Sequence, residues 1–124
     1  MGSTTKTLYE LIGENRLISL VEEFYKRVYA HPTLSILFQN DIAEVKDKQL
    51  CFLTQFLGGP QLYTEKYGHP RMRMRHAPHA IDEKAKTEWL ICMKEAIETL
   101  DLEPRLADAL YNCFPAVAQH MVNR

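Results

Sequence analysis

The stretch Asn15-Arg16-Leu17-Ile18-Ser19-Leu20-Val21-Glu22-Glu23-Phe24-Tyr25-Lys26-Arg27-Val28-Tyr29 decides the fold class. Its apolar side chains recur at steps of three and four residues, at Leu17, Leu20, Val21, Phe24 and Val28. This spacing puts them on one face of an α-helix, whereas a strand would alternate every second residue. The stretch therefore predicts an amphipathic helix, which ends at His31-Pro32 because the residue before a proline disfavours helical geometry.

The same helical periodicity continues outward over most of the chain. A short segment is expected at 33–38 and a helix at 42–57, which Gly58-Gly59-Pro60 stops. Asp82 can cap a helix that runs to Leu100, and Pro104 suits the first position of a last helix that Pro115 should bend. The pattern predicts these inner-face residues: Val45, Gln49, Phe52, Leu53 and Phe56; Trp89, Met93, Ala96, Ile97 and Leu100; Leu106, Ala109, Leu110, Cys113, Val117 and Met121.

The remaining residues are expected to be irregular. Residues 58–72 carry glycine and proline with little helical pattern and are predicted to form a loop, followed by a helical turn at 74–76 that Pro78 ends. Residues 1–7 are predicted to be a frayed terminus. With no internal repeat or interdomain linker, residues 1–124 are expected to form one all-α domain.

Composition excludes several classes of protein. The 124 residues are 46% hydrophobic and 25% charged, which is typical of a soluble globular domain with its own core. A formal net charge of -1 argues against a general nucleic-acid binder. No apolar run approaches the ~20 residues of a membrane span, and no signal peptide opens the chain. Cys51, Cys92 and Cys113 lack CxxC spacing, which favours reduced thiols and a cytoplasmic protein.

One basic segment stands apart from this even composition: Gly68-His69-Pro70-Arg71-Met72-Arg73-Met74-Arg75-His76-Ala77-Pro78-His79. It places histidines beside cationic side chains between two apolar, helix-like stretches. Imidazole is a common axial ligand of haem iron, and cations suit the haem propionates. The segment therefore indicates a haem site, for which the rest of the chain must supply the pocket.

Polar side chains on the predicted inner faces carry further information. Gln49 lies between Val45 and Phe52 at helical spacing, Tyr25 adjoins Phe24, and Trp89 adds an indole N–H to the face of another helix. Burying such a group without a partner costs about 1–3 kcal/mol. Either each donor finds a backbone carbonyl, as buried donors usually do, or the three donors converge on one small polar guest.

A family resemblance runs from about Tyr9 to Asn123. Its carriers, in this order, are Phe24-Tyr25, Phe38, Gln49, Phe52-Leu53-Thr54-Gln55-Phe56-Leu57-Gly58-Gly59-Pro60, Tyr63-Thr64-Glu65, Gly68-His69-Pro70, Met74-Arg75-His76-Ala77-Pro78, Trp89-Leu90 with Cys92-Met93, and His120-Met121-Val122-Asn123. In this order and spacing, the sequence resembles the group II truncated haemoglobins, in particular the bacillus-type branch. The resemblance implies a truncated globin fold, a 2-on-2 helical sandwich around haem b.

The resemblance also implies roles for individual residues. His76 matches the proximal histidine that binds the iron, and Phe38 matches the aromatic residue that stacks on the haem. Tyr25, Gln49 and Trp89 match the distal residues that hydrogen-bond an iron-bound ligand. Lys48 and Arg75 match propionate partners, with Tyr63 a weaker candidate, and the rest of the pocket would be lined by Phe52, Leu53, Met72, Met93 and Ile97.

Two positions depart from the family pattern. His79 stands where relatives usually have an aromatic residue, and Val45 stands at the distal gate, where Thr or Ala is common. An apolar gate cannot donate a hydrogen bond, so ligand stabilisation falls to the other three distal residues. His76 and His79 also leave open a non-haem metal site, although Pro78 prevents a regular helical pair.

The resemblance implies binding of dioxygen and other small diatomic or anionic ligands at the iron. Donors from the three distal residues should slow oxygen release, which favours oxygen, nitric oxide, peroxide or sulfide chemistry, or sensing, over bulk transport. Weak peroxidase-like or nitric oxide dioxygenase-like activity is conceivable, with a separate reductase and a monomer or weak homodimer. The alternative of another class is a haem-free globin-fold regulatory or interaction domain.

Overall fold

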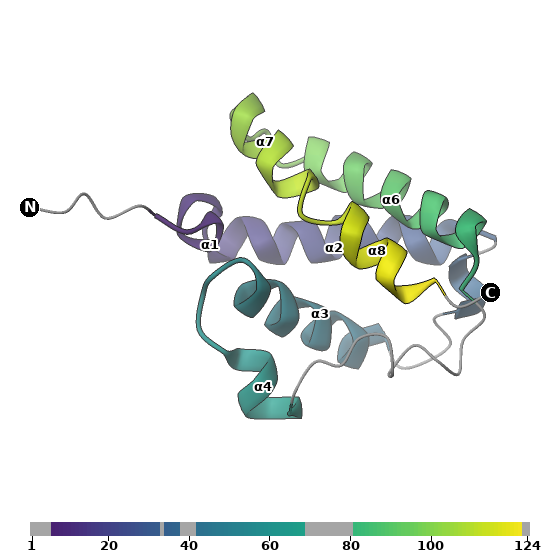
Figure 1. Cartoon of the computed structure of the whole chain (residues 1–124), viewed down its shortest axis with the longest axis horizontal. Coiled ribbons are helices and arrows are strands. Elements are labelled where there is room, and N and C mark those ends of the chain that lie inside the picture. The colour runs from purple at the N-terminus through teal and green to yellow at the C-terminus, as the bar shows by residue number, and fades with distance from the viewer. Residues whose placement is uncertain (1–5, 33, 38–41, 69–80, 123–124) are drawn as a thin grey trace, which may run out of the picture.

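The computed structural model describes residues 6–32, 34–37, 42–68 and 81–122, and all regular elements in these ranges are helices (Figure 1). They are α1 (Leu8–Ile12), α2 (Glu14–Ala30), the 3-10 helix η1 (Leu34–Leu37), α3 (Ile42–Phe56), α4 (Leu62–Tyr67), α6 (Glu83–Glu98), α7 (Pro104–Tyr111) and α8 (Pro115–Met121). The expectation of an all-α fold is confirmed. No helix in the described part of the chain is long and apolar enough to cross a membrane.

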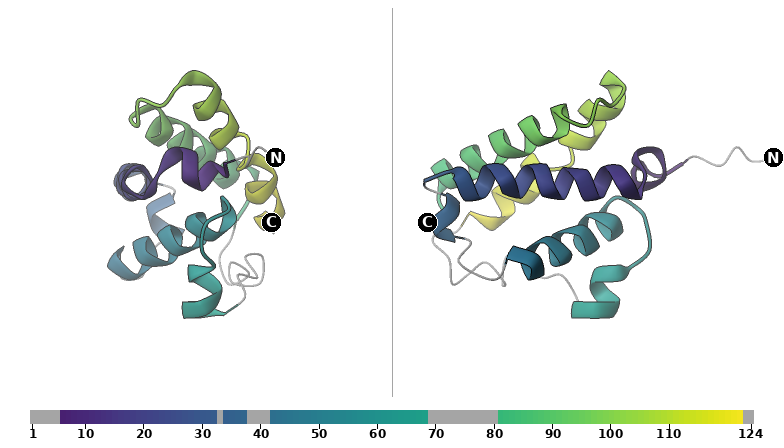
Figure 2. Two further views of the ribbon diagram at one scale, coloured as in Figure 1. Left: turned by 90° about the vertical axis from the view of Figure 1, so that its left-hand side faces the viewer. Right: turned by 180° about the vertical axis from the view of Figure 1, so that it is seen from behind.

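Helix α2 is the central element of the fold. It contacts α6 on one side and α3 on the other, while α4 packs on α3 and both α7 and α8 pack on α6. Figure 1 and the right-hand view of Figure 2 show α6 and α7 above α2 and α3 and α4 below it, while α8 crosses the level of α2. Its predicted apolar face is confirmed, because Leu17, Leu20, Val21, Phe24 and Val28 are all buried.

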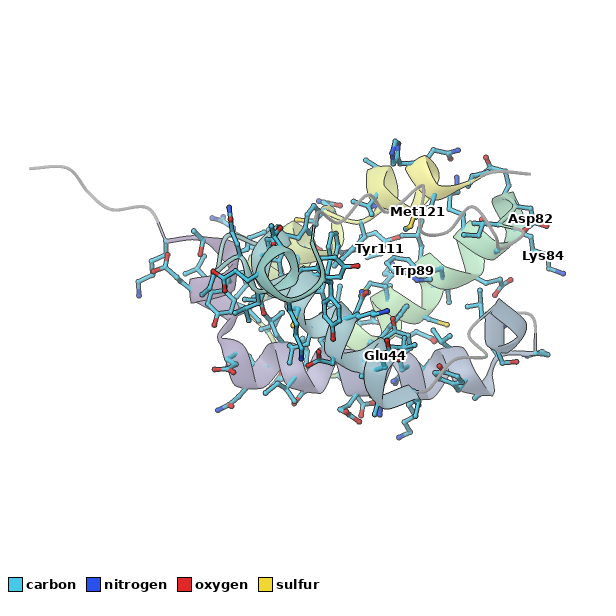
Figure 3. The ribbon with its side chains drawn as sticks, turned by 90° about the horizontal axis from the view of Figure 1, so that it is seen from below. Glu44, Asp82, Lys84, Trp89, Tyr111 and Met121 are labelled. Carbon is cyan, nitrogen blue, oxygen red and sulfur yellow. The ribbon has the colours of Figure 1, made fainter. Side chains whose placement is uncertain are left out.

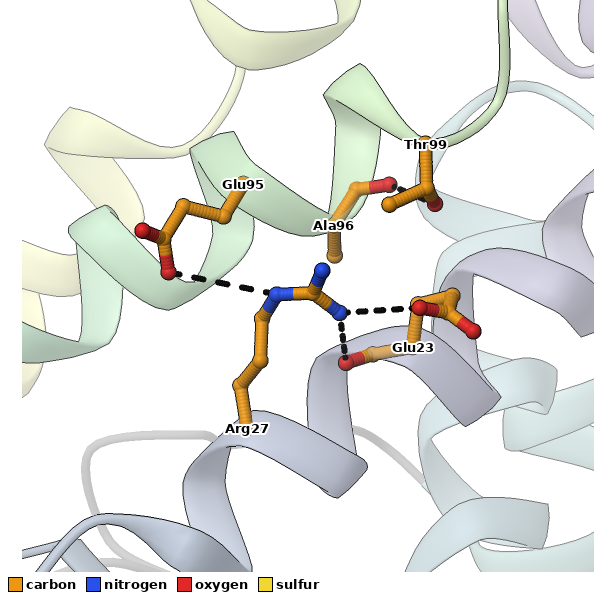
Figure 4. A network of polar contacts seen from close by, with 5 residues as sticks. All are labelled: Glu23, Arg27, Glu95, Ala96 and Thr99. Atoms are coloured by element: carbon orange, nitrogen blue, oxygen red, sulfur yellow. Dashed lines mark hydrogen bonds and ion pairs between the residues drawn. The ribbon is translucent and has the colours of Figure 1, made fainter.

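Helix α6 also begins where the sequence indicates. The Asp82 carboxylate accepts a hydrogen bond from the Ala85 backbone N–H at 2.8 Å, which satisfies one of the free donors of the first turn. Arg27 links α2 to α6, because its guanidinium bonds Glu23 of its own helix at 2.9 Å and approaches Glu95 of α6 at 3.9 Å (Figure 4). Helices α2 and α6 are thus held together by buried apolar side chains, with an ionic contact at the edge of their interface.

The N-terminal segment is more ordered than the sequence pattern suggests. Thr7, expected to belong to a frayed terminus, caps α1 in a reciprocal pair of hydrogen bonds with Glu10, at 2.9 and 3.1 Å. The Tyr9 N–H then bonds the Leu57 carbonyl at 3.0 Å. A Cβ at Gly59 would lie 2.8 Å from ring atoms of Tyr9, so the glycine that follows α3 also admits this aromatic ring.

Two elements correct the sequence interpretation. Helix α4 lies inside the predicted loop at 58–72, where the Gln55 side chain accepts from the Thr64 N–H at 2.9 Å and donates to the Thr64 hydroxyl at 2.8 Å. Pro115 does not bend a single helix but begins α8, after i to i+3 hydrogen bonds have closed the end of α7.

The predicted inner faces are confirmed in part. Most of their large apolar side chains are buried or half-buried, but Phe56 is 39% exposed and Ala109 is also exposed. On α3 the buried positions are Cys51, Leu53 and Thr54, with Leu57 directly after the helix. Val45, Gln49 and Phe52 of the same helix are only half-buried.

Candidate functional site

The first candidate residue, Tyr25, lies in the core on α2. Its side chain is 3% exposed, and its ring meets Phe24 edge to face with the ring centroids 4.9 Å apart. Burial, with a smaller contribution from Tyr29, raises the pKa of Tyr25 well above that of an ordinary tyrosine. The phenol is therefore a neutral O–H group at physiological pH, able to donate a hydrogen bond.

Trp89 lies on α6, and its indole is held by two buried rings. The Phe24 centroid is 5.0 Å away and the Phe114 centroid 5.9 Å away. Phe24, which is fully buried, therefore contacts both Tyr25 and Trp89 and fixes the spacing between two predicted distal donors. In Figure 3, Trp89 appears between Glu44 of α3 and Met121 of α8, and its side chain is half-buried.

Helix α3 contributes the third predicted donor, Gln49, together with Val45. Both side chains are half-buried on a helix that packs against α2. The three donors thus come from three helices, of which α2 contacts the other two.

The predicted apolar lining separates into two groups. Leu53, Met93 and Ile97 are 0%, 0% and 3% exposed and belong to the continuous core around α2. Phe52 is half-buried and stacks on Phe56 with centroids 5.4 Å apart. Tyr63, the weaker propionate candidate, is 2% exposed and meets the Phe52 ring edge to face at 6.1 Å.

Lys48, the predicted propionate partner on α3, has its Nζ 3.1 Å from the Glu44 carboxylate one helical turn earlier. The same Nζ lies 5.4 Å from the centroid of the Tyr67 ring. The side chain is 39% exposed, so this is a solvated ion pair that a stronger anionic partner could replace at small cost.

A group that sequence reasoning missed lies next to Lys48, and we term it the Asp47 cluster: Asp47, Cys51, Lys66 and Tyr67. One oxygen of Asp47, Oδ2, accepts from Lys66 Nζ at 2.6 Å and from Tyr67 Oη at 2.5 Å, with Cys51 Sγ at 4.0 Å. The hydrogen bonds from Lys66 and Tyr67 lower the pKa of Asp47, and the same carboxylate raises the pKa of Tyr67 and of Lys66. The cluster joins α4 to α3.

Little in the sequence indicates this cluster. From the sequence, Lys66 is only a cation just before the basic segment that begins at Gly68, and Asp47 is only a neighbour of Lys48. The pairing depends on α4, which the sequence pattern does not predict.

Four predicted site residues, namely Phe38, Met72, Arg75 and His76, lie outside the described residues, as does His79. Their assignments therefore stay predictions from the sequence. Within the ranges that the structure does describe, no three His, Cys, Asp or Glu side chains gather to hold a metal ion.

Comparison with known proteins gives a consistent result. A family model for bacterial-like globins matches residues 7–123. The chain is 45% identical over 124 residues to the group 2 truncated hemoglobin YjbI of Bacillus subtilis, covering 100% of this chain and 94% of that protein.

Solved structures agree with this family match. The group II truncated hemoglobin of Bacillus anthracis superposes with a TM-score of 0.93 at 41% identity, over 98% of this chain and 94% of that one. A truncated oxygen-avid haemoglobin of Bacillus subtilis superposes with a TM-score of 0.91 at 46% identity, over 95% of this chain and 100% of that one.

Proposed function

The chain belongs to the bacterial-like globin family, and from that membership we propose that it holds haem b and binds dioxygen and other small ligands at the iron. The observation that carries the proposal is the placement of Tyr25 and Trp89 against the same ring, Phe24. Two neutral donors from separate helices, beside a fully buried apolar core, suit a small ligand that gains partial negative charge when bound. Haem b, rather than a covalently attached haem, is favoured because the sequence has no Cys-x-x-Cys-His motif.

His76 is the proposed axial ligand, and Phe38 the proposed ring against the haem. Both assignments rest on the family resemblance of the sequence. A neutral imidazole is a suitable iron ligand, and the haem would supply the reversible binding of oxygen that no side chain provides.

The described residues fit such a group. Half-buried Val45 and Phe52 leave apolar surface available, with Leu53, Met93 and Ile97 in the core behind it, while Lys48 offers a cation at the solvated margin. Together with Arg75, Lys48 would pair with the propionates, as cations at a solvent edge suit carboxylates. Val45 contributes only apolar contact at the gate, and Met72 is proposed to complete the lining.

The distal residues determine how long a ligand stays. Dioxygen held by a haem would carry partial negative charge, and hydrogen bonds to charged groups contribute about 1.5–3 kcal/mol each. Two such bonds, from Tyr25 and Trp89 or Gln49, would slow oxygen release about a hundredfold or more. The similar haemoglobin of Bacillus subtilis is described as oxygen-avid, which supports the same property here.

Slow release favours chemistry on a bound ligand, or sensing, over bulk transport. We propose oxygen, nitric oxide, peroxide or sulfide as the relevant ligands, with at most weak peroxidase-like or nitric oxide dioxygenase-like turnover. We propose that any cycle that oxidises the iron draws its electrons from a separate reductase. A cytoplasmic location and a monomer or weak homodimer complete the proposal.

Haem titration tests the proposal. Purified protein should take up one haem per chain and develop an intense Soret band, which His76→Ala should weaken or shift. His120→Ala, at an exposed position on α8, is the matched control and should behave as the unaltered protein. A chain that folds but takes up no haem would instead support the haem-free regulatory or interaction domain.

A further inference from the structure

Tyr67 is in ring contact with Tyr63, the buried tyrosine that is predicted to be a weaker propionate partner. The Tyr63 and Tyr67 centroids are 5.2 Å apart, and Tyr63 in turn meets Phe52 at 6.1 Å. Tyr63 is 2% exposed, whereas Tyr67 is half-buried at the end of α4. The two phenols therefore connect the interior to the molecular surface, and an electron could cross between them in one transfer.

The surroundings of Tyr67 decide what happens when it loses an electron. Lys48 and Lys66 place their Nζ atoms 5.4 and 5.5 Å from its ring centroid. Two nearby cations disfavour a lasting positive charge on the ring, so oxidation requires that the phenolic proton leave together with the electron.

Asp47 can accept that proton. Its Oδ2 is already hydrogen-bonded to Tyr67 Oη at 2.5 Å, so the proton moves along an existing hydrogen bond without rearrangement. Lys66 keeps Asp47 ionised and ready to accept, because their hydrogen bond lowers the pKa of the carboxyl group. A phenol that has lost an electron is a much stronger acid than any carboxylic acid, so this transfer is favourable.

We propose that Tyr67 is a surface site of one-electron oxidation, with Tyr63 as the electron relay to the pocket, Asp47 as the proton acceptor and hydrogen peroxide as the oxidant. The inference rests on the proposed function, because peroxide must be reduced at the haem. It assigns a role to the Asp47 cluster that ligand binding does not need.

The step balances in electrons and protons. Hydrogen peroxide takes up two electrons and two protons and becomes two water molecules. Tyr67 supplies one electron through Tyr63 and one proton through Asp47, leaving a neutral phenoxyl radical. The second electron would come from the ferrous iron of the same chain, which becomes ferric, and the second proton from solvent. Without a reductant, two such radicals from two molecules join through a carbon–carbon bond to give dityrosine; with a soluble phenol or enediol, hydrogen atoms from that reductant restore Tyr67.

The experiment uses the full chain loaded with haem and reduced to the ferrous form, one equivalent of hydrogen peroxide and a nitroso spin trap. Mass spectrometry of proteolytic peptides then locates the adduct, and a parallel sample without the trap is examined for dityrosine fluorescence and a covalent dimer. We expect the adduct on Tyr67. Tyr67→Phe should remove most of the dimer, while Tyr111→Phe, at a half-buried tyrosine of α7, should leave it unchanged.

Two further variants test the separate parts of the relay. Tyr63→Phe should slow formation of the Tyr67 adduct several-fold, and Asp47→Asn should do the same while leaving the Tyr67 ring in place. Circular dichroism and the Soret band confirm that each variant folds and holds haem.

The outcomes are distinguishable. A normal Soret band and full consumption of peroxide, with adducts on other tyrosines and none on Tyr67, would overturn the inference and leave the proposed function intact. An Asp47→Asn variant that labels Tyr67 at the normal rate would overturn the role of the carboxylate. Absence of a Soret band would refute the proposed function, and this inference with it.

Discussion

Tyr25 and Tyr67 are the same residue type in opposite settings. Burial raises the pKa of Tyr25, whereas a hydrogen bond to Asp47 raises the pKa of Tyr67. Tyr25 is packed against Phe24 in the core and stays a neutral donor. Tyr67 lies among Lys48, Lys66 and Asp47, at a margin where protons and charges can move. An elevated pKa alone therefore does not tell what a tyrosine does. Burial leaves the phenol a fixed hydrogen-bond donor, whereas a hydrogen bond to a carboxylate gives it a proton acceptor.

The aromatic core around Phe24 should contribute most to stability. Phe24→Ala removes a fully buried ring that contacts Tyr25 and Trp89, so we expect the free energy of unfolding to fall by about 3–5 kcal/mol. Phe56→Ala, at a ring that is 39% exposed, is the matched control and should cost much less. Urea unfolding followed by circular dichroism measures both, and equal losses would contradict the assigned core.

Replacement of Tyr25 and replacement of Tyr67 should have very different effects on the rate of oxygen release. Tyr25→Phe deletes a hydrogen bond to bound oxygen and should speed oxygen dissociation about tenfold or more, since such a bond contributes at least about 1.5 kcal/mol. Tyr67→Phe keeps the ring and loses only its bond to Asp47, so the dissociation rate should stay within about twofold of the unaltered protein. Stopped-flow mixing of the oxygenated protein gives both rates. Equal rates for all three proteins would refute the donor role of Tyr25.

The N-terminal cap predicts a moderate effect remote from both tyrosines. Thr7→Ala removes the side-chain acceptor for the Glu10 N–H and should lower the free energy of unfolding by about 1 kcal/mol. Thr7→Ser keeps the hydroxyl and should be close to neutral. If thermal unfolding did not distinguish the two variants, the capping box would not contribute to stability.

Protonation of Asp47 in acid should lower the free energy of unfolding slightly. The pKa of Asp47 is lowered in the folded protein, so its contribution to stability is fully present above the unfolded value, at about pH 4, and is lost as the pH falls through the lower folded value. Asp47 is 40% exposed, so this contribution should not exceed about 1 kcal/mol. Asp47→Asn should flatten this part of the pH profile. Unfolding measured at neutral pH and in acid below the unfolded pKa checks it, and an unchanged slope would contradict the ion pair.

The long helices were predictable from the sequence for a physical reason. The central helix α2 buries one continuous face against α3 and α6, so its apolar residues recur with the helical period over its full length. The six residues of α4 are too few for such a period, and the helix depends on a side-chain clamp between Gln55 and Thr64. Such a contact between separate segments leaves no local pattern in the sequence.

The candidate site was predictable to a similar extent. Tyr25 and Trp89 stand out in the sequence as polar residues on apolar faces, and the structure brings both against Phe24. The buried face of α3 is only partly predicted, because the half-buried Val45 and Phe52 share their apolar character with the fully buried Leu53. Composition alone does not separate a surface packed on protein from one available to a cofactor.

In the proposed site, the His76 imidazole binds the haem iron on one face, and Tyr25 and Trp89 hydrogen-bond the ligand on the other. A crystal structure of the haem-loaded protein with cyanide bound tests it most directly. The account predicts a nitrogen of His76 on one side of the iron, and on the other side the ligand, within hydrogen-bonding distance of Tyr25 Oη. An iron bound by a different residue, or a Tyr25 hydroxyl turned away from the ligand, would contradict the account.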